Sequence, residues 1–291
     1  MKKSFIKKIS NRVLAISCLL LAFVACSGQP ATKPYMWIPQ QTSLDQITNF
    51  NNVKLTRIGD NCGSPQKNEF TLGNFWGFID YLGKTYGSSF INLRVYIGIC
   101  TGTLSVPKGM AKKLILIFAP MTSEDEKTVL NYYILPTRFD PSKPANFTIT
   151  KSVKDGWANK FIEAMPLETI DQVANANQYP NSTDPAKTPS DTRYATYCAA
   201  DFNDLVWLVN YYNTHGQSIS ENSLANLGAY SDNGNQRGQY SKRILIQFEF
   251  LDKKNQLFYL DTIPGFLQLS DGSSKCVTGF DNGQLCPTVC H

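Results

Sequence analysis

The last residues of the chain, LCPTVCH, carry side chains that could bind a metal. Cys286, Cys290 and His291 offer two thiolates and an imidazole, which are ligand types of tetrahedral zinc. The spacing also lies one residue away from the C-x-x-C-H motif that attaches haem. No fourth ligand is visible near them, so we favour disulfides over a metal site and predict no cofactor.

Acid–base or nucleophilic catalysis has few candidate residues in this chain. The two histidines are His215 and His291, and His215 lies in NTHG, where a predicted helix ends. A cationic imidazole at that position interacts favourably with the helix dipole, which explains the residue without catalysis. The chain contains no G-x-S-x-G motif, so a hydrolase based on serine and histidine is not favoured.

Paired carboxylates can hydrolyse glycosides without a histidine. Asp201 and Asp204 share one face of a predicted helix, and Glu249 lies on the polar side of a predicted strand. Solvated surface acids are far more common than catalytic acids, and none of these three has a visible partner that would perturb its pKa. The catalytic residues therefore stay unknown. A carboxylate-based hydrolase acting on a glycan is the alternative function, while we lean towards a protein that is not an enzyme.

Aromatic residues make up 12% of the chain and could include a platform on which sugar rings stack. Trp157 and Trp207 fall within predicted helices, so we expect both to pack in the core. Tyr35 and Trp37 lie near the start of the predicted domain, and we expect them to be exposed. A glycan is therefore one partner to consider.

The first 25 residues have the three parts of a secretory signal peptide. Five basic residues and no acid precede an apolar stretch that runs from Val13 to Ala25. A helix needs about 20 apolar residues to cross a bilayer, so this stretch is too short for a membrane span. The composition therefore predicts an exported chain.

The end of that stretch, Phe23-Val24-Ala25-Cys26, resembles the lipobox of bacterial lipoproteins. In that class the signal is cut just before the cysteine, which then carries fatty acyl chains such as palmitate. The resemblance implies that Cys26 is lipidated and anchors the protein in the bacterial cell envelope. We expect the membrane that holds this anchor to be the outer membrane. Each buried CH₂ adds about 0.8 kcal/mol to such an anchor. Cys18 would leave too short an apolar core and is expected to leave with the signal.

The charge of the whole chain comes from its targeting segment. The sequence has 28 basic and 23 acidic residues, a net charge of +5, and five of the basic residues precede the apolar stretch. The chain that follows the signal is therefore balanced in charge. Nucleic-acid binding needs a basic surface, so we expect no nucleic-acid partner.

Six cysteines follow Cys26, and an even count in an oxidising compartment predicts disulfides. Six cysteines allow 15 connectivities, and the sequence does not choose among them. We favour a bridge from Cys62 to Cys100, because each lies at the edge of an apolar run. The others are expected to hold the C-terminal tail or to close loops within it. The six are Cys62, Cys100, Cys198, Cys276, Cys286 and Cys290.

Hydrophobic periodicity predicts the secondary structure that would carry these residues. Ser43 is expected at the start of the first helix, as part of a capping box. The predicted helices cover residues 42–50, 74–87, 155–165, 167–177 and 194–216. The predicted strands cover 53–59, 90–100, 114–120, 128–136 and 147–150, with a hairpin over 243–262 that turns at 252–255.

These elements do not alternate in a regular βαβ rhythm, and the strands come as hairpins. The pattern predicts an α+β fold: a mostly antiparallel sheet of hairpins, three or four packed helices and a disulfide-stapled tail. The expected organisation is a signal peptide over 1–25, a lipidated tether over 26–34, one domain over 35–270 and a Cys-rich tail over 271–291. A loop insertion is expected at 180–193, which is rich in Pro, Ser, Thr and Asp.

The order LRVYIG, LILIFAP and LCPTVC resembles a group of exported proteins from Gram-negative bacteria whose activity is unknown. Those proteins share a strand ending in Tyr-x-Gly, a following apolar strand and a C-P-x-x-C tail. The resemblance covers under a fifth of the chain and implies no catalytic residue. We therefore expect a cell-envelope lipoprotein with a binding or structural role, whose partner is a glycan or another envelope protein.

Overall fold

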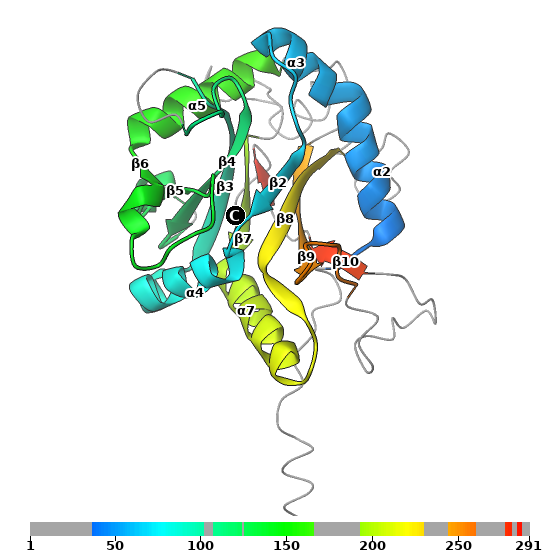
Figure 1. The fold of residues 1–291 in the computed structure, drawn as a ribbon. Coiled ribbons are helices and arrows are strands. Elements are labelled where there is room, and N and C mark those ends of the chain that lie inside the picture. Colours follow the sequence, from blue (N-terminus) through cyan, green and yellow to red (C-terminus); the bar gives the residue numbers. More distant parts are fainter. Residues whose placement is uncertain are drawn as a thin grey trace, which may run out of the picture. The chain divides into compact units, whose positions relative to one another are not determined.

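Two antiparallel sheets form the framework of the protein (Figure 1). Sheet A has the strand order β1-β10-β9-β8-β2, and sheet B has the order β11-β7-β3-β4-β5-β6. In sheet A the strands are β1 (Trp37–Pro39), β2 (Glu69–Leu72), β8 (Ile219–Ala229), β9 (Ile244–Asp252) and β10 (Val277–Phe280). In sheet B they are β3 (Asn92–Ile99), β4 (Leu114–Met121), β5 (Tyr132–Ile134), β6 (Thr148–Ile149), β7 (Tyr194–Cys198) and β11 (Gln284–Cys286).

The helices complete the predicted α+β class, which is confirmed. A π-helical segment, Asn51–Leu55, joins α2 to α3 without a break, so the α-helices of the described residues form four segments. Short 3-10 turns lie at Gly87–Ser89, Glu126–Thr128 and Pro144–Phe147. The α-helices are α2 (Gln40–Phe50), α3 (Thr56–Cys62), α4 (Phe75–Tyr86), α5 (Lys151–Ala164) and α7 (Ala199–Thr214). This computed structural model describes residues 37–101, 107–123, 125–165, 193–229, 244–259, 277–280 and 284–286.

The inner faces of both sheets share one hydrophobic core. Leu93 and Val95 of β3 are buried in the same cluster as Ile246 and Phe248 of β9. The hydroxyl of Tyr197 on β7 donates to the carbonyl oxygen of Ile246 at 2.8 Å, which links the two sheets directly. Period-two alternation in the strands explains this packing, since every second side chain points to the same face.

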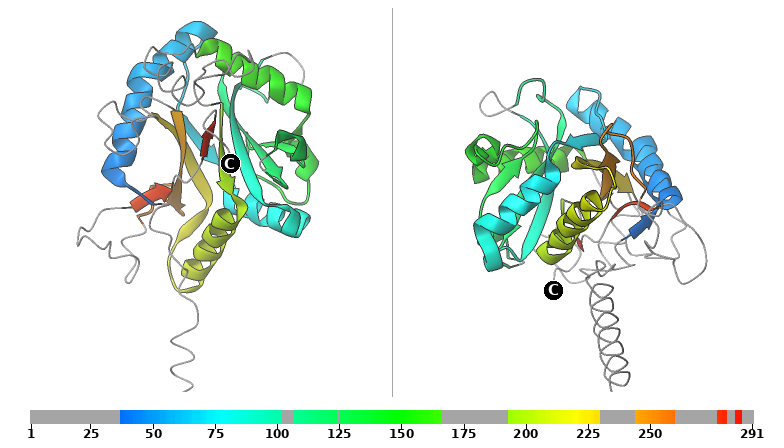
Figure 2. Two further views of the ribbon diagram at one scale, coloured as in Figure 1. Left: turned by 180° about the vertical axis from the view of Figure 1, so that it is seen from behind. Right: turned by 60° about the horizontal axis from the view of Figure 1, so that its bottom comes forward.

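Each sheet has an outer face covered by a helix (Figure 2). Helix α2 lies along β8 of sheet A, and α5 lies along β3 of sheet B. A glycine permits the close approach in both places. A Cβ added at Gly228 would lie 3.1 Å from the Cβ of Gln46 on α2, and one at Gly98 would lie 3.2 Å from the Cβ of Trp157 on α5.

Two sequence predictions of secondary structure are wrong. Residues 53–59 are helical rather than a strand, because Leu55 and Ile58 face inward at helical spacing while Val53 is 40% exposed. Residues 194–198 form strand β7 rather than the first turn of α7, because they pair with β3. Ser43 does not cap α2, since the helix begins three residues earlier.

The other helices and strands within the described ranges lie close to their predicted positions. Helix α4 ends at Gly87, whose φ of 52° is the left-handed value that glycine adopts without strain. Among the described residues of the hairpin predicted over 243–262, pairing is found near the turn, where the N–H of Phe258 donates to the carbonyl oxygen of Phe250 and a bridge joins Leu251 to Leu257. The long partner of β9 is β8, which the sequence did not predict as a strand. The helix predicted over 167–177 lies outside the described residues.

The structure gives no support to the expected disulfide-stapled tail, whose Cys276 and Cys290 lie outside the described residues. Strand β10 from the tail pairs with both β1 and β9, and β11 pairs with β7. The tail therefore joins both sheets through backbone hydrogen bonds. Edge strands carry unpaired N–H and C=O groups, so any extended segment can add to them whatever its cysteine content.

Candidate binding groove

Helices α4 and α7 pack side by side (Figures 1 and 2). A groove lies between them and is lined by residues of both helices. Helix α4 buries Phe75, Phe78 and Leu82 in the core, and α7 buries Phe202 and Leu205 beside them. Most polar residues of both helices lie on the opposite face, as expected for amphipathic helices on a core, while Asp201 of α7 is buried. The groove runs along this polar side.

The groove has a volume of about 470 Å³. The missing side chain of Gly83 leaves room in the groove, since a Cβ at that position would contact the Oδ1 of Asn203 at 3.4 Å. A glycine inside a helix costs up to about 1 kcal/mol relative to alanine. The lining residues are Asp80, Gly83, Lys84 and Gly87 from the α4 side, with Asn203, Val206, Trp207 and Asn210 from α7.

Trp207 is the aromatic residue of the groove, and it is 42% exposed. Its ring stacks on Tyr211 at 5.1 Å between centroids and 20° between planes. Tyr211 in turn stacks on His215 at 4.1 Å and 27°. These residues are four apart, so they lie one above the other on a single helix face. Stacking covers one face of the Trp207 ring and limits its rotamers.

The polar side chains of the groove are two uncharged amides and one ion pair. Asn203 and Asn210 are exposed, and neither side chain makes a hydrogen bond to another residue within the described part of the chain. Asp80 and Lys84 form an ion pair of 2.6 Å along α4, so the single cation of the groove is neutralised. Amide groups both donate and accept, which suits a ligand that carries hydroxyl groups.

A second polar region lies beneath α2, on the outer face of sheet A. Glu249 is 4% exposed and receives hydrogen bonds from the Nδ2 of Asn226 at 3.0 Å and the Oγ of Ser43 at 3.2 Å. The Ser43 hydroxyl also lies 2.6 Å from the Oε1 of Gln247, whose Nε2 donates to Gln46. These five side chains form what we call the amide layer.

Burial raises the pKa of Glu249 to about 7, although hydrogen bonds from Ser43 and Asn226 act in the opposite direction. The nearby Glu69 carboxylate adds to the increase. Ser43 has one hydroxyl proton and lies within hydrogen-bond distance of both Gln247 and Glu249, so it donates to one of them at a time.

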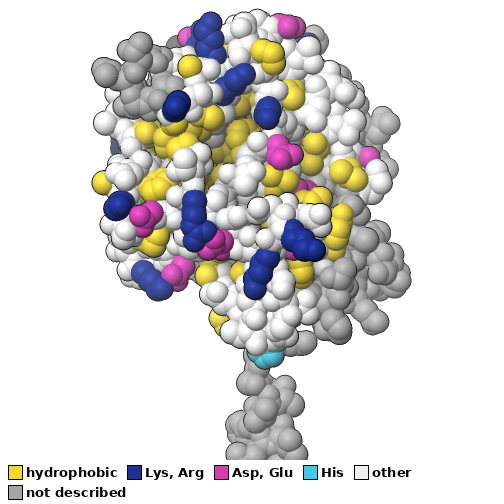
Figure 3. Space-filling view, in the orientation of Figure 1, with side chains coloured by type: hydrophobic (Ala, Val, Ile, Leu, Met, Phe, Trp, Pro, Cys, Tyr) yellow, Lys and Arg dark blue, Asp and Glu magenta, His cyan; other side chains and the backbone are white. Residues whose placement is uncertain are grey.

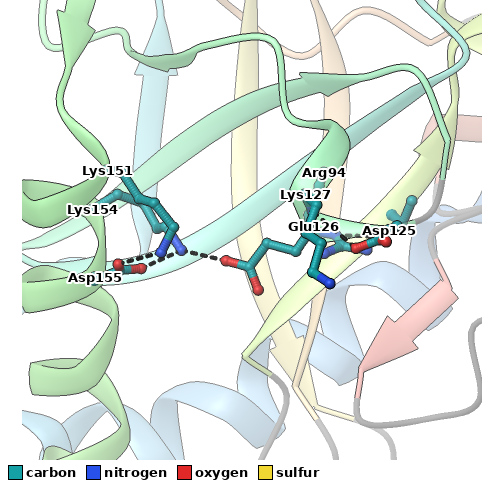
Figure 4. A network of polar contacts seen from close by, with 8 residues as sticks. Arg94, Asp125, Glu126, Lys127, Lys151, Lys154 and Asp155 are labelled. Carbon is teal, nitrogen blue, oxygen red and sulfur yellow. Dashed lines mark hydrogen bonds and ion pairs between the residues drawn. The ribbon is translucent and has the colours of Figure 1, made fainter.

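A third polar region lies beneath α5, on the outer face of sheet B (Figure 4). Lys154 is 3% exposed, and its Nζ lies 2.8 Å from Glu126 and 2.6 Å from Asp155. The same ammonium lies over the rings of Tyr96 and Tyr132, at 4.4 and 5.2 Å from their centroids. Burial disfavours the ammonium, but the carboxylates outweigh it and raise the pKa of Lys154. We call this set the lysine cluster.

The acids proposed from the sequence do not come together. Asp201 is buried and Asp204 is exposed, although both lie on α7. Glu249 lies on sheet A and is covered by α2 rather than exposed to solvent. The sequence could not predict this burial, because alternation along a strand does not reveal what packs on its polar side.

Of the two tryptophans that were expected in the core, one is buried and the other is exposed. Trp157 is 2% exposed and packs in the core as predicted. Trp207 is not a core residue, because it lies off the apolar stripe formed by Phe202, Leu205 and Val209. That offset, with Tyr211 one turn later, was the sequence signal for the groove. Tyr35 lies outside the described residues, and Trp37 begins β1.

Cys62, Cys100 and Cys198 are free thiols, so the predicted bridge between Cys62 and Cys100 is not formed. Cys100 is buried, Cys62 is half-buried and Cys198 is exposed. Burial raises the pKa of the Cys100 thiol to about 12, which makes it unreactive. Cys286 ends β11, whereas Cys26, Cys276, Cys290 and His291 lie outside the described residues.

No protein-family model, curated protein or solved structure matches this chain. Within the described residues, no helix is both long and apolar enough to span a membrane. In the same residues no group of three His, Cys, Asp or Glu side chains could hold a metal ion. His215 ends α7, where its Nδ1 lies 2.7 Å from the carbonyl oxygen of Tyr211.

Proposed function

We propose that this protein is a lipid-anchored lipoprotein of the bacterial cell envelope that binds a ligand in the groove between α4 and α7. The observation that carries the binding role is Trp207, a large aromatic ring that is exposed, stacked and next to an open groove. Aromatic residues are costly to leave in water and are enriched where proteins bind partners. The anchor is proposed from the signal-like first 25 residues and from Cys26.

Surface charge supports this proposal over nucleic-acid binding. Lys and Arg side chains are mixed with Asp and Glu on the face seen in Figure 3. The groove itself has one lysine, which is paired with Asp80. A phosphate backbone requires a basic surface, so the groove suits an uncharged or weakly charged ligand better.

A hydrolase based on carboxylates is the second candidate. A hollow of about 520 Å³ borders the amide layer and is lined in part by Glu69, Asn68 and Asn226. Glu249, with its raised pKa, would be the proton donor of such a site. However, Ser43 on α2 covers Glu249, and both carboxyl oxygens already have partners. The groove therefore supports a function better than the hollow does.

The anchor is tested by mass spectrometry and by fractionation of cells that express the full chain. We expect Cys26→Ser to remove the lipid and release the protein from membranes, whereas Cys18→Ser leaves both unchanged. A Cys26→Ser protein that is still lipidated and membrane-bound would contradict the proposal.

The binding role is tested in the same cells with a photo-crosslinking amino acid at position 210. Asn210 lines the groove, so a bound ligand would be within reach of this side chain. We expect crosslinked adducts that disappear in the Trp207→Ala background. A probe at the exposed Leu44 on α2 serves as the control, and equal labelling at both positions would argue against the groove.

A further inference from the structure

We propose that the groove between α4 and α7 binds a glycan, with a pyranose ring packed on the open face of Trp207. This inference rests on the proposed binding function and names its ligand class. Three features carry it: the way the aromatic ring is presented, the amides beside it, and the lack of any surplus charge in the groove.

The stack on α7 presents one aromatic face in a fixed orientation. Tyr211 covers one side of the Trp207 ring, and His215 supports Tyr211 from its other side. The Nδ1 of His215 is held 2.7 Å from the backbone oxygen of Tyr211, which fixes the far end of the stack. An aromatic face carries partial negative charge and attracts the polarised C–H groups of a sugar ring. Little side-chain entropy is then lost on binding.

The amides next to Trp207 provide partners for hydroxyl groups. Asn203 lies one turn before Trp207, and Asn210 lies almost one turn after it, so they flank the ring along the helix. Each amide offers a carbonyl oxygen and two N–H donors, and none of these is used within the described chain. Across the groove, the Asp80 carboxylate accepts a hydrogen bond from Lys84 and has lone pairs left for hydroxyl groups of a ligand.

The same lining disfavours other ligand classes. An amphipathic peptide helix needs a continuous apolar surface, but Val206 and Trp207 are the apolar side chains of this groove. A nucleic acid or an anionic lipid needs unpaired cations, whereas Lys84 is paired with Asp80 at 2.6 Å. A hydroxyl-rich ligand with apolar C–H faces matches both the amides and the ring.

The inference is tested with the full lipidated chain in a zwitterionic detergent, which carries no sugar headgroup. A glycan array that includes peptidoglycan fragments, lipopolysaccharide oligosaccharides and plant and fungal oligosaccharides identifies ligands, and calorimetry then measures their affinity. We expect Trp207→Ala to weaken binding at least tenfold and Asn210→Ala to weaken it a few-fold. Trp207→Phe retains an aromatic face and should bind within a few-fold of the wild type.

Leu44→Ala is the matched control, because it removes an exposed apolar side chain on α2, which covers the outer face of sheet A. We expect it to bind as the wild type does. Glycan binding that is lost in Trp207→Ala and kept in Leu44→Ala supports the inference. Failure of every glycan on the array would overturn it. If crosslinking at position 210 then captures a protein, the binding function stands without the glycan, and if it captures nothing, both proposals fall.

Discussion

The two outer layers of the protein bury an ionisable side chain in opposite ways. Under α2, Glu249 is surrounded by a hydroxyl and amides, and burial raises its pKa to about 7. Under α5, Lys154 is accompanied by two carboxylates and two aromatic rings, which keep it charged. Both are less than 5% exposed. A buried charge persists only where opposite charge comes with it, since desolvation otherwise favours the neutral form.

The lysine cluster should respond most strongly to substitution. We expect Lys154→Met to lower the free energy of unfolding by about 3 kcal/mol. The Glu126 and Asp155 carboxylates lose the ammonium that lies between them, and the two tyrosine rings lose the same cation. Urea unfolding at neutral pH measures the change. Lys151→Met is the matched control, since Lys151 pairs with the same Asp155 but is 64% exposed. It should cost less than about 1 kcal/mol, and equal costs would contradict the comparison.

Removing the charge of Glu249 in the amide layer should stabilise the protein at high pH, whereas removing the charge of Lys154 should destabilise it. The pKa of Glu249 rises from 4.5 to about 7, so its contribution to stability is complete below 4.5 and is lost as the pH rises through 7. This loss amounts to about 3 kcal/mol. We expect Glu249→Gln, which mimics the neutral carboxyl, to be more stable than the wild type at about pH 8 and nearly equal to it at pH 4. A difference that does not vary with pH would show that Glu249 does not titrate in this range.

The acid side of the comparison is tested at Glu126. The hydrogen bond and charge of Lys154 outweigh the effect of burial and lower the pKa of this carboxyl below 4.5. Its contribution to stability is therefore present at neutral pH and is lost as the pH falls through the folded-state pKa. We expect Glu126→Gln to cost less than about 1 kcal/mol at pH 7, because Asp155 still pairs with Lys154 and Glu126 is half-exposed. The deficit should shrink as the pH is lowered, and one that grows instead would contradict the assignment.

The smallest expected effect comes from Glu69, whose carboxylate adds to the high pKa of Glu249. Glu69→Gln should lower the titration midpoint of Glu249 by a few tenths of a pH unit, as expected for one screened charge near the surface. Carbon-13 NMR of labelled glutamate side chains measures this midpoint. An upward shift would mean that Glu69 stabilises the ionised form of Glu249.

Periodicity in the sequence was enough to place the main elements. Residues 74–87 and 114–120 form α4 and β4 as predicted. Apolar side chains at helical spacing line one face of a helix, and a short continuous apolar run fits a strand that is buried on both faces. The same reasoning failed at 53–59, where alternation suggested a strand and the chain continued a helix. Strand β8 was missed because polar residues interrupt its apolar pattern, and pairing with β9 and β2 holds it in the sheet.

The sequence by itself determined the fold class, the ends of α4 and the inward faces of the strands, since these depend on neighbours a few residues away. Tertiary structure decided which polar residues are buried. Ser43 and Gln247, 204 residues apart in the chain, meet beside Glu249 and remove it from water. Trp207 came to line a groove because α4 and α7 bring Gly83 and Asn203 opposite each other. The environment of a side chain depends on what packs against it, and distant segments supply those contacts.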